Sequence, residues 1–310
     1  MICENLELHT TEEYMTLSLR HWILRVTLIL LFIAWAGLAL AQPARSKKVY
    51  MVTDMEGVDG IVGKWEEQCD PFKSPRWAES QKLLTDEVNA AAEGLFQGGA
   101  TDIVVADLHD SSRSLSVVGI EPRVRLLQGP GISPTIELDS SYAALIFIGQ
   151  HAMAGAENGI LSHSYAFEIQ NIWVNGKPTG EIGGRVMLAG YFGIPAIMLS
   201  GDTAACKEIR QLVPEAECAE VKSGVSRTGG YLLSHSAACK LISEKARRAM
   251  ERLSEFKPYK VEGPVEVKVE VTVEGQGIIR PRDGVERVNE RTTSYRGKDI
   301  VDAWLKWSDF

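Results

Sequence analysis

Residues 49–57 read Val-Tyr-Met-Val-Thr-Asp-Met-Glu-Gly, an apolar run that ends in two carboxylates and a glycine. Three later segments repeat this form: residues 103–110 (IVVADLHD), 143–151 (AALIFIGQH) and 195–203 (PAIMLSGDT). Apolar runs without alternation are typical of strands that are buried on both faces of a sheet. The four segments therefore predict four buried strands, each followed directly by polar residues.

Helical patterns lie between these predicted strands. Residues 79–97 carry apolar side chains at helical spacing and stop at Gly98-Gly99, and residues 181–192 and 204–212 are predicted helices on the same grounds. Strands that alternate with helices indicate βαβ units, so we expect an α/β fold with a mostly parallel sheet flanked by helices. Such sheets bind ligands at the carboxyl ends of their strands.

The C-terminal third of the sequence has a different pattern. Residues 236–256 predict a long amphipathic helix, and residues 299–307 predict a short one. Between them, residues 265–274 alternate valine with polar side chains, which is typical of a strand with one solvated face. We therefore expect an α/β domain at residues 42–214 and a smaller α+β region at residues 215–310.

Composition limits the class of protein. The chain has 310 residues, of which 45% are hydrophobic and 24% charged, as in ordinary globular proteins. This mixture excludes a disordered protein, a collagen-like fibre and a polytopic membrane protein. The formal net charge of −8 repels phosphate backbones, so nucleic acid is not an expected partner.

The N-terminus has the form of an export signal. Residues 26–41 form an apolar run that follows two arginines and ends in Ala39-Leu40-Ala41, the small-x-small pattern of a cleavage site. Residues 1–41 are therefore predicted to be a signal peptide. The acidic segment before Met15 suits such a signal poorly, which makes Met15 a candidate start. We expect a periplasmic or secreted protein that meets a membrane only through this leader, with an uncleaved anchor as the alternative.

Four cysteines remain after the predicted cleavage site: Cys69, Cys206, Cys218 and Cys239. An oxidising compartment permits disulfides, and four cysteines allow three pairings between which the sequence does not choose. Because none of them forms a C-x-x-C pair, a zinc site built on cysteines is not expected, and free or structural thiols are favoured.

Candidate metal ligands follow the predicted strands. Asp54 and Glu56 lie two residues apart, so in extended backbone both side chains point to the same side. His109 and His151 follow two other strands. Mixed histidine and carboxylate ligands suit zinc or a similar divalent ion, and a carboxylate can bridge two such ions.

Each candidate also has a structural interpretation. Asp54 and Glu56 could cap a turn, and His109 and His151 could be a loop and a packed histidine. His163 could hydrogen-bond within its own turn. Two more polar residues are best explained structurally: Asp202 as the cap of the following helix, and His235 at a helix start.

Five short motifs give the sequence a resemblance to a known family. They are Asp54-Met55-Glu56-Gly57, Asp107-Leu108-His109-Asp110-Ser111, Gly149-Gln150-His151-Ala152, Ser162-His163-Ser164 and Gly180-Glu181-Ile182-Gly183. In order and approximate spacing they resemble the zinc-dependent D-aminopeptidases of the dipeptide-operon type. Gly201-Asp202 and Ser226-Arg227 are similar as well. The resemblance covers roughly residues 48–251, and it is the five motifs jointly that make it specific.

The resemblance implies a dinuclear zinc site. Asp54 would bridge two zinc ions and Glu56 would hold one of them, while the other ion would be held by His109, His151 and Glu181. His163 would be the catalytic residue, as a nucleophile or as a general acid or base. Without this resemblance, Glu181 would be explained by its place at a helix start, where a carboxylate favours the helix dipole.

The family also implies a substrate and an assembly: short peptides with N-terminal D-residues, and a ring-shaped homodecamer. We therefore expect an exported metal-dependent aminopeptidase that forms a homo-oligomer. The alternatives are another metal-dependent amide or phosphoester hydrolase, or a non-catalytic periplasmic peptide-binding protein. Two features depart from the family pattern: the export leader, and an extra residue between His151 and His163.

Overall fold

The computed structural model describes residues 21–22, 24–27, 46–129, 137–276 and 285–308. The chain divides into two units, Met1–Arg45 and Ser46–Phe310. Of the predicted signal peptide only residues 21–22 and 24–27 are described, and they are helical; the rest of that segment lies outside the described residues. None of the helices within the described part of the chain is both long enough and apolar enough to cross a membrane.

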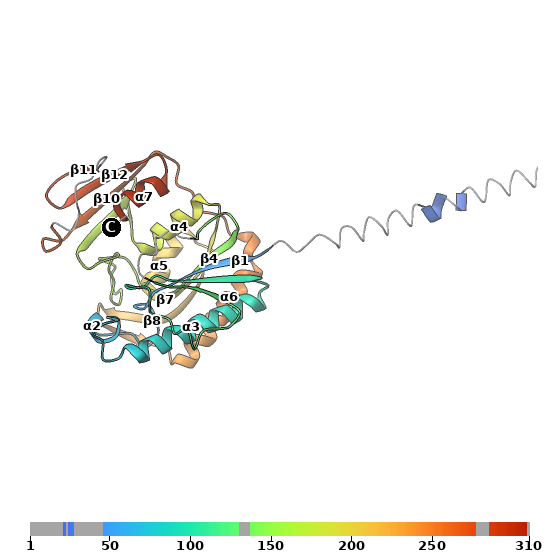
Figure 1. Cartoon of the computed structure of the whole chain (residues 1–310), viewed down its shortest axis with the longest axis horizontal. Helices are drawn as coiled ribbons and strands as arrows, with labels where there is room; N and C mark the ends of the chain where they lie inside the picture. Colours follow the sequence, from blue (N-terminus) through green and yellow to red (C-terminus); the bar gives the residue numbers. More distant parts are fainter. Residues whose placement is uncertain (1–20, 23, 28–45, 130–136, 277–284, 309–310) are drawn as a thin grey trace, which may run out of the picture. The chain divides into compact units, whose positions relative to one another are not determined.

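A seven-stranded sheet forms the centre of the second unit (Figure 1). Its order is β3-β2-β1-β4-β7-β8-β9, and all neighbouring pairs are parallel except β8 and β9. The strands are β1 (Lys48–Thr53), β2 (Asp102–Asp107), β3 (Arg125–Leu127), β4 (Tyr142–Gln150), β7 (Ala196–Asp202), β8 (Glu217–Ser226) and β9 (Gly229–Leu232). The predicted mostly parallel α/β sheet is confirmed.

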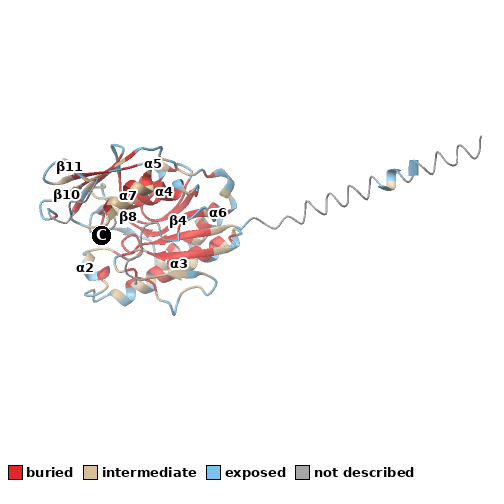
Figure 2. Ribbon diagram, turned by 45° about the horizontal axis from the view of Figure 1, so that its top comes forward, coloured by how far each residue is buried: buried red, intermediate tan, exposed pale blue. Residues whose placement is uncertain are grey.

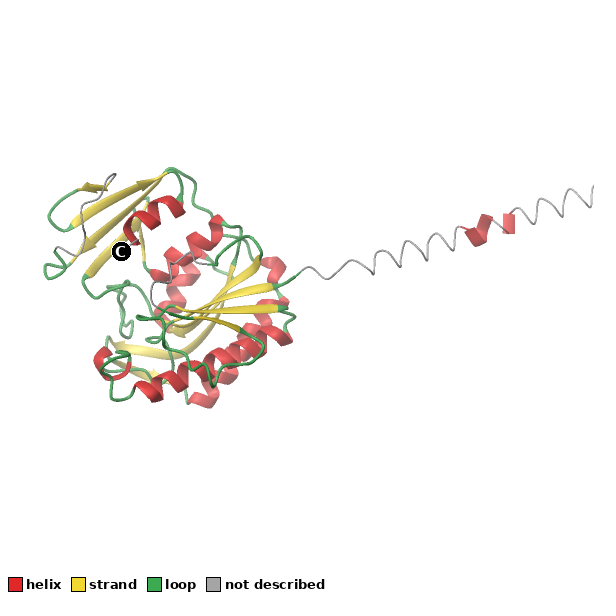
Figure 3. Cartoon of the chain, in the orientation of Figure 1, coloured by secondary structure: helices red, strands yellow, loops and turns green. Residues whose placement is uncertain are grey.

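Helices cover both faces of this sheet, as Figure 3 shows by secondary structure. On one face α3 (Trp77–Gln97) packs against α6 (His235–Glu251). On the other face α4 (Glu181–Tyr191) packs beside α5 (Thr203–Leu212). The helices leave β1 and β4 buried along nearly their whole length, which explains their uninterrupted apolar sequences (Figure 2).

A second, antiparallel sheet lies beyond α4. Its order is β11-β12-β10-β5-β6. The strands are β5 (Ile169–Val174), β6 (Lys177–Thr179), β10 (Val265–Val271), β11 (Val285–Arg287) and β12 (Thr292–Gly297). The valines of β10 are buried and the residues between them are half-buried, as the alternating pattern predicts. The final helix α7 (Ile300–Ser308) packs on this sheet and also contacts α4.

The division between the sheets differs from the expected boundary at residue 214. Strands β8 and β9 and helix α6 follow that boundary but belong to the first sheet and its helical cover. Strands β5 and β6 precede it but pair with β10 in the second sheet. The reason is that residues 169–179 leave the first sheet as a hairpin between β4 and α4, so each sheet draws on both parts of the chain.

The four cysteines of the second unit are all free. Cys69, Cys206 and Cys218 are buried, and Cys239 is half-buried. Burial raises the pKa of the Cys239 thiol to about 12, which keeps it protonated and unreactive at neutral pH. The free thiols agree with the favoured structural interpretation.

Candidate metal centre

The candidate ligands meet where the order of the parallel strands reverses. Asp54 follows β1, His109 follows β2 and His151 follows β4, and these three strands are neighbours in the sheet. The chain runs from β1 outward to β2 on one side, while β4 pairs with β1 on the other side. A crevice at the carboxyl ends of the strands is expected at such a reversal.

One group of ligands consists of Asp54, Glu56 and His109. Nδ1 of His109 lies 3.2 Å from Oδ1 of Asp54 and 3.2 Å from Oε2 of Glu56. One ligand atom from each residue lies within 4.8 Å of the others, and all three side chains are buried. This spacing allows the three atoms to surround one cation.

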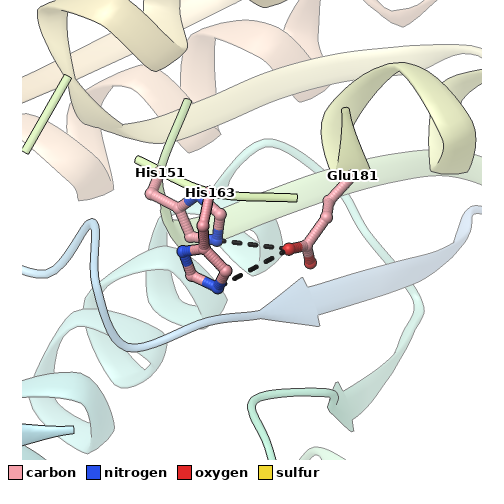
Figure 4. Close-up of side chains that lie close together, drawn as sticks. All are labelled: His151, His163 and Glu181. Atoms are coloured by element: carbon pink, nitrogen blue, oxygen red, sulfur yellow. Dashed lines mark ion pairs between the residues drawn. The ribbon is translucent and has the colours of Figure 1, made fainter. Parts of the chain in front are cut away.

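A second group consists of His151, His163 and Glu181 (Figure 4). Nε2 of His151 lies 3.3 Å from Oε1 of Glu181, and Nε2 of His163 lies 4.0 Å from the same oxygen. The two imidazole rings are stacked with their centres 3.9 Å apart. Glu181 is the first residue of α4, where its carboxylate also accepts a hydrogen bond from the backbone N–H of Tyr165.

Asp54 connects the two groups. Its Oδ1 faces His109, and its Oδ2 lies 3.2 Å from Nε2 of His151. Two donors hold the carboxylate in this orientation: the backbone N–H of Met55 at 2.8 Å from Oδ1 and the side-chain amide of Gln150 at 2.7 Å from Oδ2. A carboxylate held in this way can be shared by two cations.

Backbone carbonyls fix which nitrogen each histidine presents. Nε2 of His109 donates to the carbonyl of Cys69 at 2.8 Å, which leaves Nδ1 for the carboxylates. Nδ1 of His151 donates to the carbonyl of Ala152 at 2.9 Å, which leaves Nε2. A ring nitrogen that donates to a carbonyl determines the tautomer, and this is the usual support for a metal-ligating histidine.

The charges of this site affect one another strongly. Burial alone would lower the pKa of His109, but the Glu56 charge and the Asp54 hydrogen bond outweigh it, so that pKa lies well above its usual value. Burial alone would raise the pKa of Asp54, but the His151 charge and the His109 hydrogen bond hold it well below its usual value. The carboxylates therefore remain ionised and favour positive charge next to them.

Two buried atoms test whether a metal fits. Oε2 of Glu56 and Nε2 of His151 are inaccessible to water and make no well-aligned hydrogen bond, although each lies 3.2 Å from another ligand atom. Buried polar atoms without partners are costly, and each of these belongs to a different ligand group. Imidazole nitrogens and carboxylate oxygens are the donors that zinc takes, so the residues fit zinc at both positions.

Gly57 brings the two halves of the site into contact. A β-carbon at this position would lie 2.1 Å from the carbonyl oxygen of Gln150 and 2.4 Å from the carbonyl carbon of Gly149. The backbone N–H of Gly57 also donates to the carbonyl of Gly149 at 2.7 Å. The turn after β1 can therefore lie directly on the end of β4 only because residue 57 has no side chain.

A cavity of about 480 Å³ opens onto both groups. Aromatic side chains form much of its wall, including Trp65 and Phe167. The indole N–H of Trp65 donates to Oε1 of Glu56 at 2.7 Å. The ring of Phe167 lies 4.6 Å from that of His163. Trp65 begins the short helix α2 (Trp65–Gln68), so the loop after Glu56 forms one wall of the site.

The structure brings all six expected site residues together, with one difference in grouping. The resemblance places His109 with His151 and Glu181, whereas in the structure Nδ1 of His109 faces Glu56 and Asp54. The reason is the sheet order, since β2 and β4 flank β1 on opposite sides.

The two residues interpreted as structural lie outside the site. Asp202 is the N-cap of α5 and accepts from the backbone N–H of Ala205 at 2.7 Å, as expected. His235 contacts Asp59 at 2.9 Å and Asp86 at 3.0 Å, which are not among the candidate ligands.

Sequence reasoning did not identify two supporting residues. Gln150 orients Asp54, and its position directly before His151 was the available signal. Lys222 is buried in β8 and donates to the backbone carbonyls of Glu56, Val58 and Ile61, the last two at 2.8 and 2.7 Å. Nothing local in the sequence indicates this contact, because it spans more than 160 residues.

Comparisons with known proteins agree with this geometry. The family model Peptidase_M55, described as D-aminopeptidase, matches residues 47–307. A D-aminopeptidase of Bacillus subtilis (strain 168) is 30% identical over 262 residues, which cover 83% of this chain and 94% of the relative.

A solved structure shows the same fold. It is described as the Zn-dependent D-aminopeptidase DppA from Bacillus subtilis, a self-compartmentalizing protease. It aligns with a TM-score of 0.76 at 28% identity, over 83% of this chain and 94% of that one. The family match includes the C-terminal helix that the sequence motifs did not reach. The chain therefore belongs to the D-aminopeptidase family Peptidase_M55.

Proposed function

We propose that this protein is a zinc-dependent aminopeptidase that removes N-terminal D-residues from short peptides. The observation that supports this best is the pair of buried ligand groups that share Asp54 beside an open cavity. The D-aminopeptidase relatives support the reaction, and the zinc-dependent relative supports the metal.

Two zinc ions fit the donor set. Glu56 and His109 would hold one ion, His151 and Glu181 the other, and Asp54 would contribute to both. Bound zinc supplies Lewis-acid polarisation of the scissile carbonyl and of a water molecule. Gln150 holds the Asp54 carboxylate so that it faces both ligand groups. The carbonyls of Cys69 and Ala152 fix which ring nitrogen His109 and His151 direct at the carboxylates.

His163 is the proposed proton carrier. Its Nδ1 donates to the carbonyl of Leu161 at 2.9 Å, so Nε2 is the basic nitrogen on the side of Glu181. The residue lines the cavity and can accept a proton from the attacking water and return it to the leaving amine. Leu161 and Tyr165, two residues to either side, both have positive φ values of 53° and 63°. Strained backbone of this kind is commonly retained where it positions a catalytic group.

The test compares hydrolysis of D-alanyl and L-alanyl dipeptides by the purified protein with zinc, each with a chelator control. We expect chelator-sensitive release from the D-peptide and none from the Asp54→Ala variant. Exclusive cleavage of the L-peptide would overturn the stereochemistry while preserving the metallopeptidase. Activity retained in Asp54→Ala, or no cleavage by zinc-loaded protein, would overturn the proposed function.

We also propose that the protein is exported and processed after Ala41. The support is the apolar run before Ala41 and the division of the chain at Arg45, close to that site. Mass spectrometry of the protein isolated from a secreting host tests this. A chain beginning at Gln42 is expected, and an intact N-terminus on cytoplasmic protein would contradict it.

Self-association is the third part of the proposal, with the family's homodecamer as the expected size. One relative is described as self-compartmentalizing. In this chain the edge hairpin of the first sheet exposes Val225 and Tyr231, apolar side chains of the kind that interfaces cover. Sedimentation velocity measures the mass directly, and a monomer at micromolar concentration would refute it.

A further inference from the structure

Arg185 is a buried cation that forms no ion pair with any of the described residues. It lies on α4 one turn after Glu181, so the two side chains share a face of the helix. It is 7% exposed, and its Nε and Nη1 atoms are buried without a hydrogen-bond partner. None of the ion pairs found among the described residues includes it.

An unpaired guanidinium at this buried position lowers the stability of the folded protein. A buried charge without a partner costs far more than an apolar side chain of similar volume, so a merely structural role would favour methionine or leucine here. The alternative is that a bound ligand supplies the negatively charged partner of this guanidinium. Arg185 also lines the cavity that contains Asp54 and Glu181, and it is the one arginine or lysine among the described residues of that lining.

Tyr165 provides a second donor at the same place. Its ring centre lies 6.0 Å from the guanidinium carbon of Arg185. Its hydroxyl is buried without a hydrogen-bond partner, and the residue lines the same cavity. Trp307 packs edge-on against the Tyr165 ring at 5.2 Å, so the ring is held in place. Two buried donors thus lie near each other in the cavity wall.

The fold positions this part of the cavity wall relative to the metal ligands. The backbone N–H of Tyr165 donates to Glu181, which ties the Tyr165 position to the ligand group. Trp304 lies against α4 at Gly184, where a β-carbon would meet its ring at 2.4 Å. The close packing of α7 on α4 therefore fixes the wall around Arg185.

We propose that Arg185, assisted by the Tyr165 hydroxyl, binds the C-terminal carboxylate of the peptide substrate. This proposal rests on the proposed aminopeptidase function and specifies its substrate class. A carboxylate accepts charge-assisted hydrogen bonds from a guanidinium, and Arg185 is part of the cavity lining. Asp110 and Glu168 also line the cavity, and their negative charges disfavour a carboxylate next to them.

The spacing limits the length of the peptide. Arg185 lies four residues after Glu181 on the helix, a rise of about 6 Å along the axis. One residue of extended peptide spans about 3.3–3.6 Å. One or two residues after the scissile carbonyl therefore bring a C-terminal carboxylate to Arg185. The favoured substrates are dipeptides and tripeptides with a free carboxylate, and longer or amidated peptides are disfavoured.

The test is a ratio of kcat/KM values for D-Ala-D-Ala and its C-terminal amide. We expect wild-type protein to favour the free acid by about 10- to 100-fold, the range for a hydrogen bond to a charged group. Arg185→Met should reduce this ratio to near one, and Tyr165→Phe should reduce it by a smaller factor. Arg123→Met, a surface arginine away from the cavity, is the matched control and should keep the wild-type ratio.

The outcomes separate the two proposals. Equal cleavage of acid and amide by wild-type protein would overturn the carboxylate site, even if Arg185→Met failed to fold. If Arg185→Met lowers kcat/KM equally for the acid and the amide, Arg185 has a structural role, and the carboxylate site is also overturned. If zinc-loaded wild-type protein cleaves neither substrate, the aminopeptidase function itself fails. A thermal-shift measurement gives a second readout: a free-acid peptide should raise the melting temperature of wild type more than of Arg185→Met.

Discussion

The contact at Gly57 allows a quantitative test of how the two halves of the site are joined. A β-carbon at residue 57 would lie 2.1 Å from the carbonyl oxygen of Gln150, and β-carbons in proteins essentially never come within 3.0 Å of another heavy atom. In Gly57→Ala the turn after β1 and the end of β4 must therefore separate by about 0.9 Å or more. The three nearest atoms to this β-carbon all belong to the backbone of Gly149 and Gln150, so no side-chain rotation can relieve the contact.

This separation has two measurable consequences. Asp54 and His151 lie on opposite sides of the contact, and a misplacement of about 1 Å in a catalytic site can cost about 100-fold in rate. We expect kcat/KM for a D-alanyl dipeptide to fall by that factor, with weaker zinc retention during dialysis. Overpacking of this kind also destabilises by about 1–3 kcal/mol, which lowers the melting temperature by several degrees.

The matched control is Gly229→Ala. There the nearest heavy atom to an added β-carbon is Oγ of Ser226 at 3.8 Å, an ordinary contact. This variant should retain both activity and zinc. If Gly57→Ala keeps wild-type activity and zinc content, the two halves of the site do not depend on this backbone contact, and the reasoning is refuted.

Three further predictions concern residues around the site. His163→Ala should lower kcat/KM by at least about 100-fold, the range for general acid–base catalysis, with unchanged bound zinc by elemental analysis; loss of zinc would make His163 a ligand instead. Lys222→Met removes the donor to three buried carbonyls and should lower the free energy of unfolding in urea by more than about 2 kcal/mol; an unchanged midpoint would contradict this. Burial alone would lower the pKa of His235, but hydrogen bonds to Asp59 and Asp86 raise it above its usual value. The stability that these hydrogen bonds contribute is therefore complete below the pKa of the unfolded state and is lost as pH rises through the raised pKa of the folded state. His235→Gln should therefore lower the melting temperature more at pH 5.5 than at pH 9, and equal losses would contradict the assignment.

The sequence predicted the local elements of the fold better than their assembly. The apolar run before Asp54 and the alternating valines before residue 272 both became strands, because each pattern follows from which faces of a strand are buried. Strand pairing depends instead on contacts between distant residues. The hairpin of β5 and β6 carries an Asn175-Gly176 turn, which is a strong local signal for two paired strands but does not indicate which sheet they join.

The same distinction applies to the site. Asp54, His109 and His151 could be expected because they directly follow strands whose carboxyl ends meet. Lys222 and Arg185 could not, because their roles come from burial and from partners that only the assembled fold defines. The division of ligands between two ions also requires the strand order, which the sequence pattern does not determine.

The composite second sheet has a consequence for how the protein folds. Its β5 and β10 strands pair residues as far apart in sequence as Ile169 and Val271. Closing so long a loop costs chain entropy before any contact compensates for it, so such pairings form late. Glu181 directly follows this sheet's edge hairpin, whereas Asp54 and His109 follow neighbouring parallel strands. We therefore expect the Asp54 group, which needs only β1 and β2, to form before Glu181 is in place, and an enzyme that stays inactive until β5 and β10 have paired.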